Sequence, residues 1–353
     1  MSNKGPVGHE LNYRRRRILY ALLSEYIATG EPVGSRKLAK RYGLNLSPAT
    51  IRNVLADLEE LGYLIQPHAS AGRVPTGAGF RVFVDALVQF REVSSDDQAA
   101  IARRLQGLSP QDDVLRETGR LLSALAGAAA VIASPRPDEE ILEEIRFLRL
   151  RSDQVLAVLV LQGGAVQNRV LRLDEQDCGP SELERINNYL AARVSGASLV
   201  SIRQRIASEV AGERNNYDEL RRQAARIIDD LGDEAGPVQV VIEGQSELFD
   251  RPEFSNVDTI KGYLRAFEDR EHLLSLLDRT ILAGGVQVVI GAEAQIEAVE
   301  DISLIAASYR KSASAVGTLG VIGPARMDYA KLMPLVAFTA QYLTELHISS
   351  DEA

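Results

Sequence analysis

Hydrophobic residues recur every three to four positions along the first ninety residues, which is the spacing of helices with one buried face. The first pattern runs from Tyr13 to Thr29 and stops at Gly30, with Pro32 just beyond. The second runs from Ser35, a good N-cap residue, to Tyr42, where Gly43 supplies a left-handed stop. We therefore predict two consecutive helices separated by a short turn.

A third helix has clear boundaries, because Ser47 is a good N-cap, Pro48 suits the first helical position and Gly62 ends the pattern. Its apolar stripe consists of Ile51, Val54, Leu55, Leu58 and Leu61. The opposite side presents small and polar side chains, namely Ala49, Arg52, Asn53 and Ala56, with Thr50 on the flank. Arginine can bind guanine and asparagine can bind adenine bidentately, and alanine lets the helix approach the groove floor. We predict that this face contacts base edges in DNA, whereas Glu59 and Glu60 keep the far end away from phosphate.

The segments on either side of this helix carry the other candidate DNA contacts. The second helix exposes basic residues, and the predicted backbone contacts are Arg36, Lys37, Lys40, Arg41 and Ser47. A short hairpin follows the third helix, with strands at residues 63–65 and at Val74, and Thr76 caps a fourth helix that extends to about Phe90. Its small-residue turn would form a wing that touches DNA through His68, Ser70 and Arg73. This order of elements predicts a winged helix-turn-helix.

The charge distribution agrees with this prediction, although the net charge of −9 does not. Residues 1–90 hold 12 Lys and Arg against 7 Asp and Glu, a net charge of +5, which leaves 28 against 42, a net charge of −14, for the remainder. A basic N-terminal region on an acidic body concentrates DNA affinity in that region.

Strands and helices alternate in the rest of the 353-residue chain, which is too long for one ordinary domain. Strands are predicted at residues 129–133, 145–150, 155–161, 166–173, 238–243, 286–290, 303–308 and 318–322. Helices are predicted at residues 112–125, 181–194, 198–211, 217–231, 257–279 and 328–346. Strands on both sides of a mostly helical middle indicate an α+β domain that is interrupted by an insertion.

Several classes of site and location are disfavoured by composition. The single cysteine, Cys178, excludes an internal disulfide and multi-cysteine metal sites, and the four histidines are isolated from one another. We find no nucleophile–base pair, metal cluster or phosphate loop, so we expect no enzyme activity, no metal and no cofactor. No apolar stretch approaches the roughly 20 residues of a membrane span, and the start lacks a secretory signal, so we expect a cytoplasmic protein.

Two runs of sequence closely resemble the HrcA family of heat-inducible repressors of bacterial chaperone operons. They are SPATIRNVLADLEELGYLIQPHASAGRVPTGAGFRVFVD, at residues 47–85, and GTLGVIGPARMDYAKLMPLV, at residues 317–336. Together they bracket nearly the whole chain, and the departure from the family within residues 75–80 affects only the start of the fourth helix. The resemblance implies a dimer that binds an inverted-repeat operator upstream of chaperone genes, and it implies that the chaperonin GroEL helps to keep the repressor active.

The family resemblance also implies the fold class: a multidomain protein, with an all-α-rich winged helix-turn-helix followed by an α+β GAF-like domain that contains an inserted, mostly helical dimerisation segment. We assign residues 1–92 to the DNA-binding domain, residues 93–180 and 281–353 to the GAF-like domain, and residues 181–280 to the insertion. In the helix at 257–279, Tyr263, Phe267 and Leu274 belong either to the core of the insertion or to a dimer face.

Two alternative functions remain open from the sequence. The GAF-like domain could hold an effector, which would make the protein a small-molecule-gated regulator; an apolar pocket with convergent polar groups would favour this. An enzyme with an accessory winged helix would need catalytic groups that the sequence does not offer. The leading hypothesis is a DNA-binding repressor without catalysis.

Overall fold

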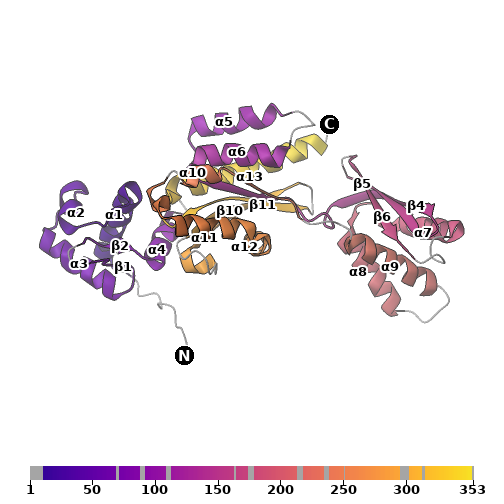
Figure 1. The fold of residues 1–353 in the computed structure, drawn as a ribbon, viewed down its shortest axis with the longest axis horizontal. Helices are drawn as coiled ribbons and strands as arrows, with labels where there is room; N and C mark the ends of the chain where they lie inside the picture. Colours follow the sequence, from indigo (N-terminus) through magenta and orange to yellow (C-terminus); the bar gives the residue numbers. More distant parts are fainter. Residues whose placement is uncertain are drawn as a thin grey trace. The chain divides into compact units, whose positions relative to one another are not determined.

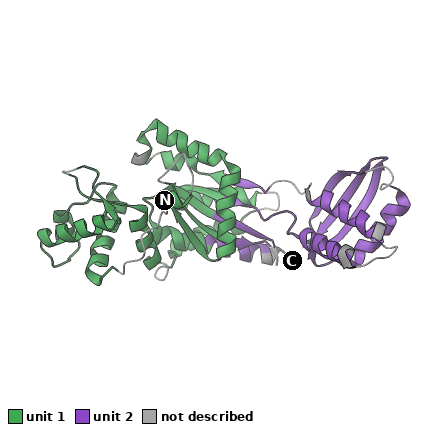
Figure 2. Cartoon of the chain, turned by 90° about the horizontal axis from the view of Figure 1, so that it is seen from below, with its two compact units in different colours: residues 1–131, 242–307, 320–338 green, residues 132–241, 308–319, 339–353 purple. Residues whose placement is uncertain are grey.

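The computed structural model describes residues 11–68, 71–87, 92–108, 113–162, 164–173, 179–212, 218–233, 238–249, 251–294, 302–311 and 315–351. The chain divides into two compact units, which Figure 2 colours separately. Unit 1 consists of residues 1–131, 242–307 and 320–338, and unit 2 of residues 132–241, 308–319 and 339–353. Each unit is assembled from separate stretches of sequence, and the prediction of a multidomain protein of helices and sheets is confirmed.

Unit 1 begins with residues 11–87, which we call the head. Its elements are α1 (Tyr13–Thr29), α2 (Ser35–Arg41), α3 (Pro48–Glu60), β1 (Leu64–Ile65), β2 (Val74–Pro75) and α4 (Gly77–Leu87), as labelled in Figure 1. The apolar stripes of the first three helices meet in one core, whose fully buried side chains include Ile18, Leu19, Leu22, Leu38, Ile51 and Leu55. The predicted order of helices and hairpin in the head is confirmed. The expected end of the fourth helix, near Phe90, lies outside the described residues.

One local prediction in the head is wrong. Ser35 does not cap α2; the N-cap is Gly34, and Ser35 is the first helical residue and is buried. The helix starts one residue earlier because the chain is fixed at Val33, whose backbone N–H and C=O pair with Arg73 at 2.9 and 3.0 Å. A contact across forty residues therefore decides this boundary.

The other helices of unit 1 are α5 (Ser95–Gln106), α6 (Val114–Ala126), α10 (Gln245–Phe249), α11 (Val257–Glu268) and α12 (Arg270–Ala283), with the 3-10 turns η2 (Pro252–Ser255) and η3 (Gly291–Ala294). A five-stranded sheet has the order β8-β3-β11-β10-β9. Its strands are β3 (Ala129–Ala133), β8 (Val240–Glu243), β9 (Val286–Ile290), β10 (Ile302–Arg310) and β11 (Val316–Pro324), and the last helix is α13 (Tyr329–Asp351). All of these except β9 have residues in both units. In Figure 1, α5 and α6 are drawn on one side of β10 and β11, and α11 and α12 on the other.

Unit 2 contains a second, four-stranded sheet of order β6-β5-β4-β7. Its strands are β4 (Ile141–Arg151), β5 (Gln154–Leu161), β6 (Val166–Arg172) and β7 (Ala197–Ser198), and its helices are α7 (Pro180–Val194), α8 (Leu199–Gly212) and α9 (Asp218–Asp233). One face of the sheet packs against these helices, so that Phe147 and Leu159 share a core with Ile186, Ile202 and Ile228.

β4 pairs with β7 only at Ile141 and Leu142, and farther along the same edge a side chain takes the place of a strand at Phe147. The Asn187 amide donates to the Phe147 carbonyl oxygen at 3.0 Å and accepts from the Phe147 N–H at 2.9 Å. Asn187 lies on α7 and makes the two hydrogen bonds that a neighbouring strand would otherwise make.

The predicted boundaries of the insertion differ from this division. Strands β4–β6, which we assigned to the GAF-like domain, form one core with α7–α9. Helices α11 and α12, which we assigned to the insertion, belong to unit 1. The apolar alternation of the strands shows that they need covering helices, but it does not specify which helices cover them.

The single helix predicted at residues 257–279 is two helices. Asp269 ends α11 and caps α12, where its carboxylate accepts the backbone N–H of His272 at 3.1 Å. Because the chain changes direction at Asp269, α11 and α12 each bury their own apolar side. Tyr263 and Phe267 are consequently buried, with the Tyr263 ring centroid 4.7 Å from that of Phe254.

Candidate nucleic-acid interface

The N-terminal half of α3 presents an exposed polar face. Ser47 caps the helix, as predicted, because its hydroxyl accepts the Thr50 N–H at 3.1 Å. Ala49, Arg52 and Asn53 are exposed, and Thr50 and Ala56 are partly buried. Ala49, Arg52, Asn53 and Ala56 share one face of α3, and Thr50 lies on its flank. In the described part of the chain, the side chains of Arg52 and Asn53 make no hydrogen bond or ion pair, so their donors and acceptors are available.

Two of the four basic residues of α2 that we predicted to contact phosphate form ion pairs within the head instead. Lys37 Nζ lies 2.9 Å from Glu25 Oε1, and Arg41 Nη1 lies 2.8 and 2.9 Å from the two Glu25 oxygens. Arg36 and Lys40 are exposed, and no described residue pairs with either. The predicted cluster of four cations is therefore divided into two paired and two unpaired groups.

Glu25 is the centre of this internal cluster. Its side chain has no solvent exposure, and it also accepts the Tyr42 hydroxyl at 2.9 Å. The hydrogen bond from Lys37 is the main reason why the pKa of Glu25 lies below its ordinary range, with Tyr42 and Arg41 adding to the effect against the opposing effect of burial. We did not single out Glu25 from the sequence. The signal was present, because Glu25 follows Leu22 by three positions and Ile18 by seven, which places a carboxylate on the buried stripe of α1.

The predicted wing is the hairpin β1–β2 with the residues between its strands, and only part of the expected contact set is exposed there. His68 is exposed, and Ser70 lies outside the described residues. The side chain of Arg73 is only 14% exposed, because its Nε and Nη2 atoms both lie 2.9 Å from Glu59 Oε2 on α3. Arg73 is therefore turned toward the helix and away from solvent.

The N-terminus of α1 adds two exposed cations. Arg14 and Arg16 are exposed and, among the described residues, without an ion-pair partner. Their neighbour Arg15 pairs with Asp57 of α3 at 2.7 Å, and Arg17 donates to the Gly43 carbonyl oxygen at 3.3 Å. In this run, Arg14 and Arg16 are therefore available to the solvent, whereas Arg15 and Arg17 are bonded to other residues of the head.

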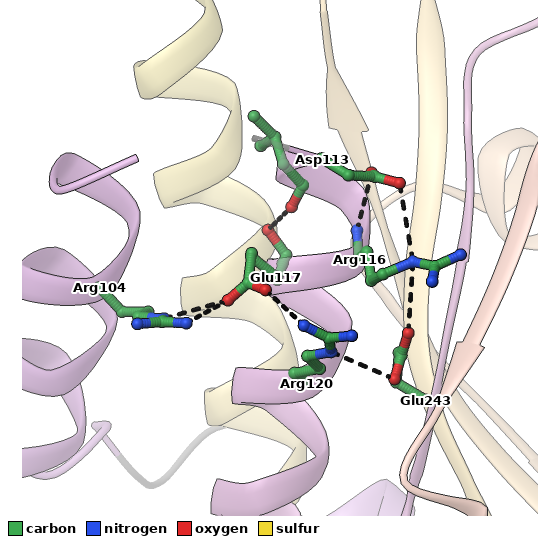
Figure 3. A network of polar contacts seen from close by, with 8 residues as sticks. Arg104, Asp113, Arg116, Glu117, Arg120 and Glu243 are labelled. Atoms are coloured by element: carbon green, nitrogen blue, oxygen red, sulfur yellow. Dashed lines mark hydrogen bonds and ion pairs between the residues drawn. The ribbon is translucent and has the colours of Figure 1, made fainter. Parts of the chain in front are cut away.

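A second charged cluster lies on α5, α6 and β8 and is self-compensating (Figure 3). Glu117 pairs with Arg104 and, at 2.8 Å, with Arg120, while Glu243 lies 3.5 Å from Arg120 and 3.6 Å from Arg116. The pKa of Glu117 is lowered chiefly by the hydrogen bond from Arg104. Because each guanidinium faces a carboxylate, the cluster joins three elements of unit 1 and does not offer an anion site.

The tentative dimer residues occupy interior positions. Tyr263 and Phe267 are buried and Leu274 is partly buried, but in unit 1 and not in the core of the insertion to which we assigned them. Large exposed apolar side chains occur in the same two helices, α11 and α12, at Val257, Leu264 and Leu282. They also gather on the open face of β4–β6, where Leu148, Leu150, Val166 and Val170 are each at least half exposed. In the part of the chain that can be described, no helix is long and apolar enough to cross a membrane, and no group of His, Cys, Asp and Glu side chains could hold a metal ion.

Comparison with known proteins connects this geometry to one family. Residues 112–333 match the family model described as the HrcA protein C-terminal domain. The chain is 48% identical to the heat-inducible transcription repressor HrcA of Sorangium cellulosum over 341 residues, which cover 96% of this chain and 98% of that protein. It is 40% identical to the protein of the same name from Geobacter sulfurreducens over 338 residues, with the same shares covered.

A solved structure resembles the fold. It is the crystal structure of a hypothetical protein, 22% identical in sequence, with a TM-score of 0.61 over 97% of this chain and all of that one. At this level of identity the likeness concerns the arrangement of helices and strands alone.

Proposed function

This chain belongs to the HrcA family of heat-inducible transcription repressors, and we propose that it represses heat-shock (chaperone) operons by binding an inverted-repeat operator as a dimer. The observation that carries the proposal is the exposed face of α3, whose Arg52 and Asn53 are held one turn from a fixed helix start and are unpaired within the described residues. The relatives are named as repressors and not as enzymes.

We propose that the head is a winged helix-turn-helix with α3 as its recognition helix. Base contacts would come from Ala49, Thr50, Arg52, Asn53 and Ala56. Phosphate contacts would come mainly from Ser47, Arg36 and Lys40, because Lys37 and Arg41 are paired with Glu25. Exposed Arg14 and Arg16 add positive charge to the head. This set is smaller than the basic composition of the head suggests.

A single winged helix makes few base contacts, so an inverted repeat requires two heads. We propose that two subunits associate through the open face of β4–β6. Leu148, Leu156 and Val170 form one apolar row across the three strands, with the polar residues Glu144, Arg146, Asn168 and Arg172 beside it on the same face. Contact with a second molecule would remove this row from water. A second copy of the chain offers an identical face, as a two-fold interface requires.

The dimer contact can be tested by sedimentation of the full chain. We expect the pair Leu148→Lys and Val170→Lys to give monomers, because like charges then meet at the interface. Glu184→Lys, on the exposed side of α7, changes the net charge by the same amount and should leave the dimer intact. A dimer that survives the paired substitution would place the interface elsewhere.

We also propose, from the family resemblance alone, that repressor activity depends on GroEL. We expect addition of the chaperonin to purified protein to raise the fraction competent to bind the operator. An unchanged active fraction, measured by titration against excess labelled operator, would contradict this dependence.

The proposed function is tested by footprinting purified protein on the chaperonin promoters of its own chromosome. We expect protection of an inverted repeat whose half-sites lie whole helical turns apart, with two heads per site. Equal binding to these promoters and to unrelated DNA of the same length would refute sequence-specific repression.

A further inference from the structure

We propose that Arg73 is a positioning residue, which sets the wing against α3 through Glu59, and that it is not a contact to DNA. The proposal rests on the proposed function, because it concerns how the base-contacting face and the wing are held together. It also replaces the role in phosphate or groove binding that the sequence predicted for this arginine.

The backbone at the base of the wing is fixed to the turn between α1 and α2. Val33 and Arg73 exchange both of their backbone hydrogen bonds, at 2.9 and 3.0 Å. Gly72 is so close to this turn that a Cβ atom there would lie 2.5–2.6 Å from backbone atoms of Val33. A residue with a side chain at position 72 would therefore force the two segments apart.

The side chain of Arg73 completes this attachment on the other side. Two of its nitrogens converge on a single oxygen of Glu59, in the last turn of α3, and the guanidinium is largely covered. One residue thus joins the wing to the turn through its backbone and to α3 through its side chain. Charge-assisted hydrogen bonds of this kind are stronger than neutral ones and restrict geometry.

The position of Glu59 argues against a phosphate at this place. A phosphate bound to Arg73 would have to displace a carboxylate already held at 2.9 Å, and the released carboxylate would repel it. The pair instead keeps the wing at a constant distance from Arg52 and Asn53. We infer that this distance contributes to recognition of the operator and that non-specific DNA binding does not depend on it.

The test uses the full-length protein with Arg73→Gln, Glu59→Gln and the exchange Glu59→Arg with Arg73→Glu, which keeps the net charge. We expect each single variant to lower operator affinity by about tenfold, as typical for coupled charged pairs. For Arg73→Gln, affinity for unrelated DNA and the slope of log K against log salt should stay unchanged, and the exchange should restore most of the operator affinity. Arg36→Gln is the matched control: it should weaken all sequences and reduce the slope by about 0.9.

The two roles give opposite results for Arg73→Gln and for the exchange. If Arg73 binds phosphate, Arg73→Gln reduces the salt slope, and the exchange, which puts a carboxylate at position 73, weakens binding to all DNA; either result overturns the proposal. If Arg73→Gln fails to fold, as judged by circular dichroism, the exchange still decides between the two roles. Failure of the unaltered protein to prefer its operator would instead refute the proposed function itself.

Discussion

Helices α2 and α3 are neighbours in the head, and their polar side chains are used in different ways. In α2, two of the four basic residues are bound to a buried carboxylate of α1. In α3, Arg52 and Asn53 are exposed and have no protein partner among the described residues. A count of positive charges would have ranked α2 as the main DNA-binding element. The contacts indicate that α2 is partly a structural element and that the available hydrogen-bonding groups lie on α3.

The difference has a physical cause. A carboxylate without solvent exposure is costly unless its charge is compensated, and Lys37, Arg41 and Tyr42 supply that compensation from α2 and its C-cap. The first two turns of α3 carry no such demand, because their buried side is entirely apolar. Polar groups there can be reserved for another molecule.

We expect the largest effect on operator affinity from substitutions on the exposed face of α3. Ala56→Glu should abolish operator binding, because it places bulk and negative charge against the groove. Arg52→Ala should lower operator affinity about 5- to 150-fold, the equivalent of one bidentate base contact of about 1–3 kcal/mol. Titration of labelled operator measures both. Ala28→Glu, on an exposed position of α1, adds the same charge away from this face and should bind nearly as the parent does. Variants of α3 that overlay the parent, as folded dimers, would show that this face is only solvated.

An intermediate effect should come from Glu25→Gln, which removes the charge that holds α2. We expect a loss of about 2 kcal/mol in the free energy of unfolding, since charge-assisted hydrogen bonds are lost in a buried place. Urea denaturation measures this loss. The same variant releases Lys37 and Arg41, so its binding to unrelated DNA should become tighter and more salt-dependent. A variant with unchanged salt dependence would show that the two cations are available to DNA even in the parent.

The pH dependence of this effect follows from the lowered pKa of Glu25. The folded state favours the ionised carboxylate, so its stabilisation is fully present above the ordinary value of 4.5 and is lost as the pH falls through the lower folded pKa. The unfolding free energies of the parent and Glu25→Gln should therefore converge on acidification. A difference that stays constant from neutral pH to pH values well below 4.5 would exclude this cause.

We expect the smallest effect from single charge removals in α2, which compare an unpaired cation with a paired one. Arg36→Gln should reduce the slope of log K against log salt by about 0.9, as expected for one lost phosphate contact. Arg41→Gln removes the same charge from the same helix but should leave the slope nearly unchanged and lower stability instead. Fluorescence anisotropy with unrelated duplex DNA at several salt concentrations distinguishes the two. Equal slopes for both variants would remove the distinction between paired and unpaired cations.

Local signals were sufficient for much of the head. Ser47 and Pro48 specify the start of α3 by themselves, and the exposed face follows from helical periodicity. The partners of Lys37, Arg41 and Arg73 could not be predicted in this way, because Glu25 and Glu59 come from other elements. The N-cap of α2 was predicted wrongly for the same reason, since its position depends on the pairing of Val33 with a distant residue.

The division into units shows the same limit at a larger scale. The strands at residues 141–172 were predicted individually, yet alternation along a strand does not show which helices cover it. The break at Asp269 was more accessible, because Asp269 is followed three residues later by the N–H it caps. An apolar pattern that continued on both sides of this aspartate hid the change of direction.

The amide of Asn187 has a consequence for aggregation. An unpaired strand edge is a template on which another chain can add a strand, and β4 lies in a sheet that also exposes Leu148, Leu150, Val166 and Val170. By occupying the hydrogen-bonding groups of Phe147, Asn187 removes a starting point for that growth. The cover is local, because the opposite edge of the sheet is β6, which has a neighbouring strand on one side only. One side chain on a helix thus does part of the work of a neighbouring strand.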